Sequence, residues 1–231
     1  MNQLEDKFKG VFVAPPDAIR QKLKHIKAFV FDWDGVFNNG QKNENATSFF
    51  SEVDAMGTNL LRFNYYQRNH QVPITAIISG ENNSAAYALA KREHFQSIYY
   101  GIKYKALALQ HLCMTQNLKP EEVAFYFDDV LDLSMAAKCG LRIMVNRACN
   151  PLLLDFAKER NLVDYITAAE GHAHAVREGS ELLMGLSEIY NYTIEARMNY
   201  TEEYIHYLHK RNLPTTVCYT TQASAIIEKQ L

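Results

Sequence analysis

The chain has 231 residues, of which 48% are hydrophobic and 22% charged, and its formal net charge is −2. This length suits one well-buried domain with a small appendage, and the near-neutral charge offers no broad basic face for nucleic acid. No apolar run is long enough to span a membrane, and the first residues lack the apolar core of a signal peptide. We therefore expect a cytoplasmic protein with no membrane or nucleic-acid partner. The cysteines show no CxxC spacing, so neither a disulfide framework nor a zinc site is indicated.

Short β-rich runs alternate with amphipathic stretches along most of the chain. The predicted strands are 26–32, 73–79, 97–100, 123–127, 141–145 and 163–167. The predicted helices are 56–70, 82–95, 103–117, 131–139 and 151–161. Strands that alternate with helices of this length favour βαβ units, so we expect an α/β fold with a doubly wound parallel sheet covered on both faces.

Two segments depart from this alternation. Residues 36–53, "VFNNGQKNENATSFFSEV", carry turn residues between short extended pieces and predict a β-hairpin beyond the first strand. After residue 170 no further strand is expected, because 174–212 is typical of one or two helices and a polar tail follows. The predicted division is an N-terminal lead (1–24), a core (25–186) and a C-terminal helical extension (187–231).

The stretch "FVFDWDGVF" (29–37) places Asp32 and Asp34 at the end of a predicted buried strand. Ionised carboxylates are costly to bury, so the pair must reach water or meet cations. In an open parallel sheet, ligands bind beyond the carboxyl ends of the strands. The same edge is expected to hold Ser79, Lys105 and the run "DDVLD" (128–132).

These residue types together suit phosphoryl chemistry. Converging carboxylates repel one another unless a cation joins them, and hard oxygen ligands favour Mg²⁺. A serine hydroxyl and a lysine ammonium suit a phosphoryl group. One carboxylate can attack phosphorus while its neighbour exchanges a proton with the leaving oxygen. Alone, each residue would be an ordinary turn, cap or solvated side chain, and only their combination predicts a site.

The order Asp-x-Asp-Gly, strand-end serine, lysine and Asp-Asp-x-x-Asp resembles the haloacid dehalogenase superfamily of phosphohydrolases. The resemblance extends to its capless subgroup, which includes phosphatases of 3-deoxy-manno-octulosonate 8-phosphate and acylneuraminate 9-phosphate. A short hairpin stands in place of a cap domain, "GIKYK" surrounds the lysine, and "GLRIMVNRACNPLLLDFA" precedes "GHAHAVREGSELL". The likeness covers roughly residues 25–186.

This resemblance implies a Rossmann-like fold and hydrolysis through an aspartyl-phosphate. It implies that Asp32 is the nucleophile and Asp34 the general acid and base. The residues that it implies around the phosphoryl group are Ser79, Gly80 and Lys105. The implied magnesium ligands are Asp32, the Asp34 backbone carbonyl, Asp128 and Asp129, with Asp132 in support. Members of this kind are usually homotetramers in which a neighbour's hairpin closes the active site. The C-terminal tyrosines suit such an interface: Tyr190, Tyr192, Tyr200, Tyr204 and Tyr207.

The chain also departs from the sugar-acid phosphatases that it resembles. Their second motif usually continues Thr-Gly-Arg, where this chain has Ser79-Gly80-Glu81. An acid at this position is expected to repel a sugar carboxylate. Either the substrate is a different phosphate, or another cation such as Arg177 receives the carboxylate.

The sequence therefore predicts a magnesium-dependent phosphomonoesterase that acts on a small phosphorylated metabolite, with a sugar or sugar-acid phosphate as the leading class. Two alternatives stay open. A phosphotransferase would share the aspartyl-phosphate and differ only in the acceptor. A catalytically weak member would serve as an oligomeric binding or scaffold protein, although the retention of both Asp32 and Asp34 argues against it.

Overall fold

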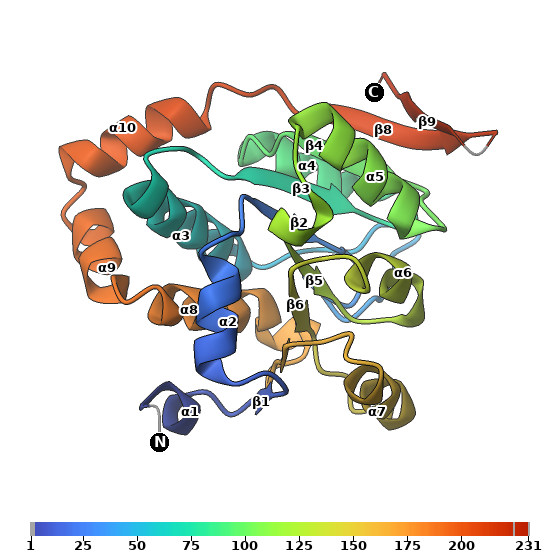
Figure 1. Ribbon diagram of the computed structural model, residues 1–231. Coiled ribbons are helices and arrows are strands. Elements are labelled where there is room, and N and C mark those ends of the chain that lie inside the picture. The colour runs from blue at the N-terminus through green and yellow to red at the C-terminus, as the bar shows by residue number, and fades with distance from the viewer. Residues whose placement is uncertain (1–2, 224, 231) are drawn as a thin grey trace.

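One sheet runs through the computed structural model, which describes residues 3–223 and 225–230 (Figure 1). Within these residues the strand order is β1-β7-β6-β5-β2-β3-β4-β8-β9. The strands are β1 (Val11–Phe12), β2 (Ala28–Phe31), β3 (Ile74–Ile78), β4 (Ser97–Tyr100), β5 (Val123–Phe127), β6 (Leu141–Met144), β7 (Tyr165–Ile166), β8 (Val217–Gln222) and β9 (Ala225–Glu228). Neighbours from β7 to β8 pair in parallel, and only the outermost strands, β1 and β9, run antiparallel.

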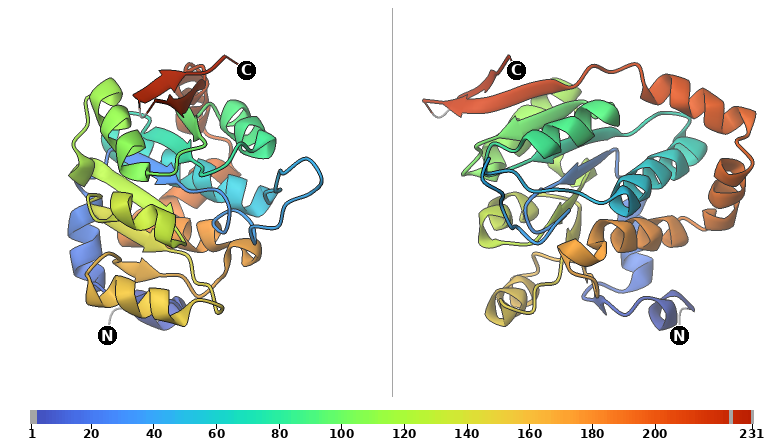
Figure 2. Two further views of the ribbon diagram at one scale, coloured as in Figure 1. Left: turned by 90° about the vertical axis from the view of Figure 1, so that its right-hand side faces the viewer. Right: turned by 180° about the vertical axis from the view of Figure 1, so that it is seen from behind.

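Helices cover both faces of this sheet (Figures 1 and 2). The helices of the described residues are α1 (Gln3–Lys7), α2 (Pro16–Leu23), α3 (Glu52–Asn69), α4 (Ser84–Arg92), α5 (Lys105–Gln116), α6 (Leu133–Ala136), α7 (Pro151–Glu159), α8 (Ala175–Leu186), α9 (Tyr190–Met198) and α10 (Glu202–Arg211). Successive side chains of β2 serve opposite faces: Phe29 and Phe31 pack with α2, α3, α4 and α8, while Ala28 and Val30 pack with α5, α6 and α7. A strand buried on both faces needs a continuous apolar sequence, and the expectation of a doubly wound α/β fold is confirmed.

The predicted β-hairpin at 36–53 is wrong, because no strand is assigned in this fully described segment, which instead forms a projecting loop that leads into α3 (Figure 2, left). Asparagine side chains take its backbone donors: Asn38 accepts from the N–H of Gly40 at 2.8 Å, and Asn43 accepts from Asn45 and Thr47 at 3.0 and 3.1 Å. These local turns use N–H groups that a strand ladder would require.

The expectation that strands end before residue 170 is also wrong. Strand β8 adds to β4 in parallel, and β9 folds back on β8. The connecting segment holds three helices rather than one or two, and left-handed residues separate them, with φ of 68° at Glu188 and 49° at Tyr200. Helices α9 and α10 follow one side of the molecule and lead the chain across to β8 (Figure 1).

Two of the C-terminal tyrosines expected at an interface are buried within the chain. Tyr204 and Tyr207 on α10 pack against Phe63 and Tyr66 of α3. Their hydroxyls bond to Asn59, at 3.2 Å to its side chain and 3.1 Å to its carbonyl. This cluster fixes the C-terminal helices to the core.

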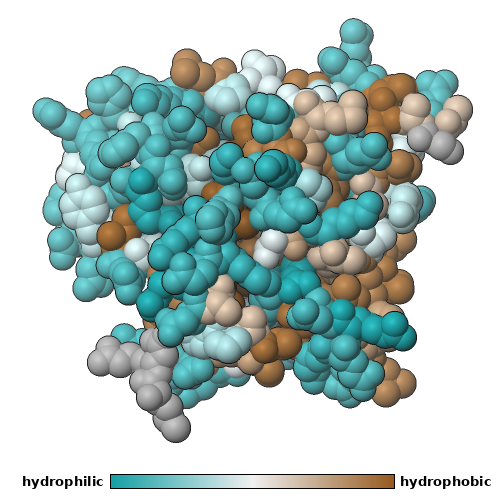
Figure 3. Space-filling view, viewed as in Figure 1, coloured by the Kyte–Doolittle hydropathy of each residue, from teal (hydrophilic) through white to brown (hydrophobic). Residues whose placement is uncertain are grey.

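Figure 3 shows a mostly hydrophilic face on which hydrophobic residues gather toward the side of β8, β9 and α7. Among residues 3–223 and 225–230, no helix combines the length and the apolar character that crossing a membrane requires.

Removing residues 214–231 should destabilise the fold. The truncation uncovers β4 and removes Tyr219, whose ring stacks on Tyr99 with centroids 5.0 Å apart. We expect a lower denaturant midpoint and self-association through the exposed edge, measured by chemical unfolding and light scattering. A chain that stops after Gln222 loses β9 but keeps β8 paired with β4. Its denaturant midpoint should therefore fall less than that of the chain without residues 214–231. Equal denaturant midpoints for the full chain and for the chain without residues 214–231 would contradict a stabilising role of β8.

Candidate active site

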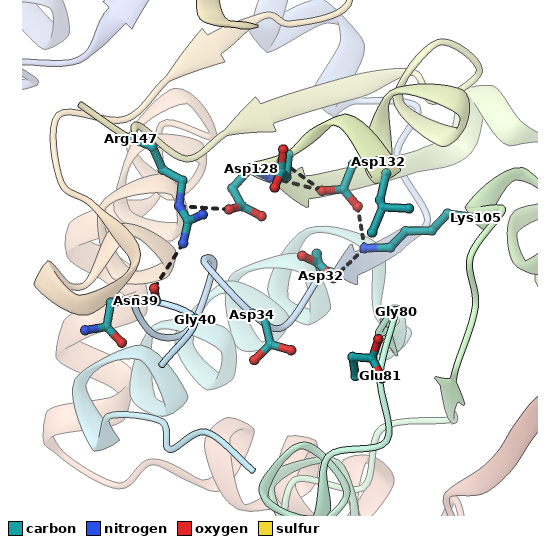
Figure 4. Close-up of a pocket in the computed structure, with 12 residues that line it drawn as sticks. Asp32, Asp34, Asn39, Gly40, Gly80, Glu81, Lys105, Asp128, Asp132 and Arg147 are labelled. Atoms are coloured by element: carbon teal, nitrogen blue, oxygen red, sulfur yellow. Dashed lines mark hydrogen bonds and ion pairs between the residues drawn. The ribbon is translucent and has the colours of Figure 1, made fainter. Parts of the chain in front are cut away.

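A cavity of about 330 Å³ lies at the carboxyl edge of the central strands (Figure 4). Its lining residues are Asp32, Asp34, Asn39, Gly40, Gly80, Glu81, Lys105, Asp128, Asp129, Leu131, Asp132 and Arg147. Asp32 follows β2, Asp128 follows β5, and Lys105 begins α5. The sheet therefore brings together residues that are far apart in the sequence, as the position of the strand ends predicted.

Lys105 joins two of the carboxylates. Its ammonium contacts Oδ1 of Asp32 and Oδ1 of Asp132, and all three side chains are at most 8% exposed. Burial opposes the charged form of Lys105, but the two carboxylates outweigh it and raise the pKa of the ammonium. Lys105 is therefore a buried cation, rather than the solvated side chain that its sequence position alone suggests.

Asp128 is almost completely buried, and neither of its carboxylate oxygens accepts a hydrogen bond from the described residues. Arg147 Nε lies 3.0 Å from Asp128 Oδ2, close enough for an ion pair but without hydrogen-bond geometry. Gly35, with φ of +90°, passes so close that a Cβ there would stand 2.0 Å from the same oxygen. The chain thus leaves space for this carboxylate without supplying donors for it.

The buried carboxylates are poorly compensated. Burial, and then the neighbouring Asp132, raise the pKa of Asp32 to about 7 although Lys105 opposes the shift. Burial, followed by Asp32 and Asp132, raises the pKa of Asp128 to about 9. Protein groups alone therefore favour the protonated forms of these carboxyl groups more than water does, and a bound cation would favour the ionised forms.

The donor set fits a hard divalent cation. Asp32, Asp128 and Asp132 each offer a carboxylate oxygen, and these atoms lie within 4.8 Å of one another. Asp132 is already engaged, since its Oδ2 accepts from the N–H groups of Asp128 and Asp129 at 3.3 and 3.1 Å and its Oδ1 contacts Lys105. Asp32 and Asp128 therefore have the freer oxygens, and Asp132 holds Lys105 and the turn after β5 in place.

The sequence grouped Asp129 with the ligands, whereas the cluster that could hold a metal among the described residues contains Asp132 instead. Asp129 lines the same cavity but is exposed, and its Oδ1 accepts from the N–H of Val130 at 2.7 Å. A metal role for Asp129 stays a prediction.

Asp34 stands apart from the other carboxylates, across the cavity from Asp128 and Asp132 (Figure 4). Its Oδ1 accepts a hydrogen bond from Ser48 Oγ at 2.6 Å, and its Oδ2 pairs with Lys42. Its side chain is half-buried and open to the cavity. The separation gives the two aspartates of the first motif different surroundings, as different chemical roles require.

Of the remaining residues that the sequence predicted for the site, some line the cavity and others do not. Gly80 and Glu81 line it, and the buried Ser79 accepts from the N–H of Glu81 at 3.3 Å. Exposed Glu81 pairs with Lys103, whose hydrogen bond lowers the pKa of that carboxyl. Arg177 does not line the cavity and pairs with Glu181 on α8 at 2.7 Å.

Sequence reasoning missed Arg147 and Ser48. Arg147 donates to the carbonyl of Asn39 at 3.0 Å besides approaching Asp128, so it ties the loop after β6 to the loop after β2. It follows the end of β6 by three residues, and the rule that placed Asp32 and Asp128 at the sheet edge could have found it. Ser48 has no comparable pattern, because its position depends on how the loop folds.

Known proteins resemble this chain in sequence and in fold. The 3-deoxy-D-manno-octulosonate 8-phosphate phosphatase of Moraxella catarrhalis, solved in complex with magnesium, phosphate and KDO, is 30% identical, with a TM-score of 0.65 over 78% of this chain and 98% of that one. A haloacid dehalogenase superfamily (subfamily III A) hydrolase of Legionella pneumophila is 27% identical, with a TM-score of 0.66 over 79% and 95%. The 3-deoxy-D-manno-octulosonate 8-phosphate phosphatase KdsC of Yersinia pestis is 28% identical over 73% of this chain and 84% of its own length. No protein-family model matches the chain.

Fold, site and relatives define a phosphatase of the class that forms its active site from aspartates at the end of a parallel sheet. The chain belongs to the haloacid dehalogenase superfamily, in the group related to 3-deoxy-D-manno-octulosonate 8-phosphate phosphatase. The resemblance noted in the sequence is thereby confirmed.

Cation binding should reverse a pH-dependent loss of stability. Asp32 and Asp128 have folded-state pKa values above the ordinary value near 3.8, so the folded protein holds protons that the unfolded chain has released. The free energy of unfolding of the chelated protein should fall as pH rises from about 5 to about 9, and Mg²⁺ should stabilise it most at the upper end. Denaturant unfolding with and without Mg²⁺ measures this.

The matched control is Asp128→Asn, which keeps the size of the side chain but removes its charge. It should flatten the pH dependence and weaken the response to Mg²⁺. Stabilisation by Mg²⁺ that is the same at every pH, or the same in this variant, would contradict a cation site at these carboxylates.

Proposed function

We propose that this phosphatase is a magnesium-dependent phosphomonoesterase that acts on a sugar or sugar-acid phosphate resembling 3-deoxy-manno-octulosonate 8-phosphate, through a phosphoryl group carried on Asp32. The observation that supports this most strongly is the pairing of two unlike aspartates in one cavity. Asp32 is buried against Lys105, and Asp34 is half-buried opposite it. A nucleophile and a proton donor need such different surroundings.

In the first step, an oxygen of Asp32 forms a bond to phosphorus as the ester P–O bond breaks. The electron pair of that bond stays on the leaving oxygen, which takes a proton from Asp34. Lys105 keeps a positive charge beside the reacting centre, and Ser79 and Gly80 at the end of β3 would hold the phosphoryl oxygens.

In the second step, Asp34 accepts a proton from water while the water oxygen bonds to phosphorus. The bond between Asp32 and phosphorus breaks, which releases phosphate and regenerates both aspartates. An acceptor hydroxyl in place of water would make the same site a phosphotransferase, and that alternative stays open. The half-open position of Asp34 favours hydrolysis, because water can reach it.

Asp32 and Asp128, with the backbone carbonyl of Asp34, would hold the magnesium ion. When bound, Mg²⁺ supplies positive charge that keeps the carboxylates ionised and stabilises charge on the phosphoryl oxygens. The Moraxella relative supports this choice, since it was solved with magnesium and phosphate.

Arg147 is the residue that we assign to an acidic group of the substrate. It lines the cavity and contacts Asp128, which would turn to the metal and release the guanidinium. Glu81, which we expected to repel a sugar carboxylate, is paired with Lys103 at the exposed rim. The charge of Glu81 is therefore balanced, and a carboxylated sugar is compatible with this cavity.

The proposal includes an oligomer, with a tetramer as the expected form. The projecting loop after β2 carries Phe49, which is 71% exposed within one chain. Contact with a second copy would bury this ring and cover the open side of the cavity.

The nucleophile assignment is tested by Asp32→Asn. An amide cannot form the acyl-phosphate and loses its charge toward the metal, so turnover of p-nitrophenyl phosphate should fall by at least 10³-fold while the circular dichroism spectrum is unchanged. Wild-type activity should vanish with chelator and return with Mg²⁺. Turnover that persists in the variant, or after thorough chelation, would overturn the assignment.

Substrate recognition is tested by Arg147→Gln. A charge-assisted hydrogen bond contributes about 1.5–3 kcal/mol, so kcat/KM for 3-deoxy-manno-octulosonate 8-phosphate should fall roughly tenfold to hundredfold more than for p-nitrophenyl phosphate. Glu81→Gln is the control and should change the two values alike. If Glu81→Gln alters the ratio of the two kcat/KM values and Arg147→Gln does not, Arg147 is not the residue that binds the substrate carboxylate.

A further inference from the structure

The loop after β2 contains a buried hydroxyl that faces the proposed proton donor. Ser48 is 1% exposed, and its Oγ donates to Oδ1 of Asp34 at 2.6 Å. The mechanism above gives Ser48 no role.

Two hydrogen-bond donors to Ser48 Oγ determine the direction in which its hydroxyl proton points. The indole Nε1 of Trp33 donates to Ser48 Oγ at 3.0 Å, and Nδ2 of Asn83 donates to it at 2.7 Å. A hydroxyl has two acceptor positions and one proton. With both positions filled by groups that can only donate, the hydroxyl proton must point to Asp34.

The start of α4 fixes the orientation of Asn83. Its Oδ1 caps the helix by accepting from the N–H groups of Ala85 and Ala86 at 3.1 and 3.4 Å, and it also accepts from Thr47 Oγ1 at 2.6 Å. The amide oxygen is therefore committed to the helix end, and the NH₂ group must face Ser48. Asn83 and Trp33 are both fully buried, so this orientation is protected from water.

The two oxygens of Asp34 are held differently. Oδ1 accepts from a buried hydroxyl that two further side chains, Trp33 and Asn83, hold in place, whereas Oδ2 pairs with Lys42, which is exposed on the loop. Only the partner of Oδ2 can move aside without breaking a buried network. Oδ2 is thus the oxygen that is free to carry and exchange a proton.

We propose that Ser48 is a positioning residue for the acid step, because it fixes the carboxyl group of Asp34 so that Oδ2 faces the leaving oxygen of the substrate. The chain of contacts runs from the start of α4 through Asn83 to Ser48 and then to Asp34. This inference rests on the proposed function, and it assigns the same site a further residue.

The test compares substrates that differ in their need for an acid. An alkyl phosphate releases a strongly basic alkoxide and needs the proton, while p-nitrophenyl phosphate releases a stabilised phenolate and needs it little. In Ser48→Ala, kcat/KM with Mg²⁺ should fall on the order of tenfold to hundredfold for the alkyl phosphate and only a few-fold for the aryl one. The quantity compared is kcat/KM, because it reports the first phosphoryl transfer and not the second step, which both substrates share. The readout is the ratio of kcat/KM for the alkyl phosphate to kcat/KM for the aryl phosphate.

Three further variants separate positioning from structural support. Ser48→Thr keeps the hydroxyl and should restore the wild-type ratio. Asn83→Asp keeps an oxygen at the cap of α4 but replaces the NH₂ donor with an acceptor. The new oxygen would accept the Ser48 proton in place of Asp34. This variant should therefore show the same substrate ratio as Ser48→Ala. Ser51→Ala removes a cap in the same loop, the bond from Val53 N at 3.0 Å, and should lower the melting temperature without changing the ratio.

An equal loss on both substrates in Ser48→Ala would overturn the inference and leave Ser48 a structural residue. If that variant does not fold, the ratio in Asn83→Asp decides in the same way. The proposed function fails separately: a wild type that hydrolyses neither phosphate with Mg²⁺, or an Asp32→Asn variant that retains turnover, would remove the site and this inference with it.

Discussion

The site depends on a shortage of positive charge among buried carboxylates. Asp32, Asp128 and Asp132 meet two protein cations, Lys105 and Arg147. Ionising a carboxyl group in such a buried position costs free energy, and the raised pKa values of Asp32 and Asp128 follow from that cost. A divalent cation would remove the shortage and leave Asp32 ionised as a nucleophile requires. The arrangement that we expect to lower the stability of the cation-free protein would therefore also prepare the proposed nucleophile, a combination that is common in enzyme active sites.

The two aspartates of the first motif are supported by separate parts of the fold. Asp32 follows β2 and is held by Lys105 from α5, so the sheet and one helix determine its position. Asp34 lies in the loop and is held by Ser48, which α4 fixes through Asn83. Because the supports are different, the proposed nucleophile Asp32 and the proposed proton donor Asp34 should be open to independent alteration. Asparagine turns stand in this loop where a hairpin was expected, and the fold of the loop places Ser48 beside Asp34.

The sequence predicts the parts of the structure that depend on local pattern. Apolar runs located β2, β3 and β5, and the geometry of a parallel sheet then placed Asp32, Lys105 and Asp128 at one edge. Strand β8 was missed although Val217, Tyr219 and the threonines after it favour strands, because the run was assigned to a polar tail and its parallel partner β4 lies far away in the sequence. The Ser48 contact was missed for a similar reason, since it requires Asn83 from another part of the chain. The pairing of Glu81 with Lys103, which balances the expected repulsion, also depends on tertiary structure.

The most direct test of the central claim is to detect phosphate on the protein itself. Asp34→Asn should slow the second step, in which water is deprotonated, more than transfer from an aryl phosphate that needs no acid. Rapid acid quenching of this variant with p-nitrophenyl phosphate and Mg²⁺, followed by peptide mass analysis, should find one phosphoryl group on Asp32. A phosphoryl group on another residue, or turnover of the aryl phosphate without any phosphorylated peptide under conditions that preserve acyl-phosphates, would contradict the account.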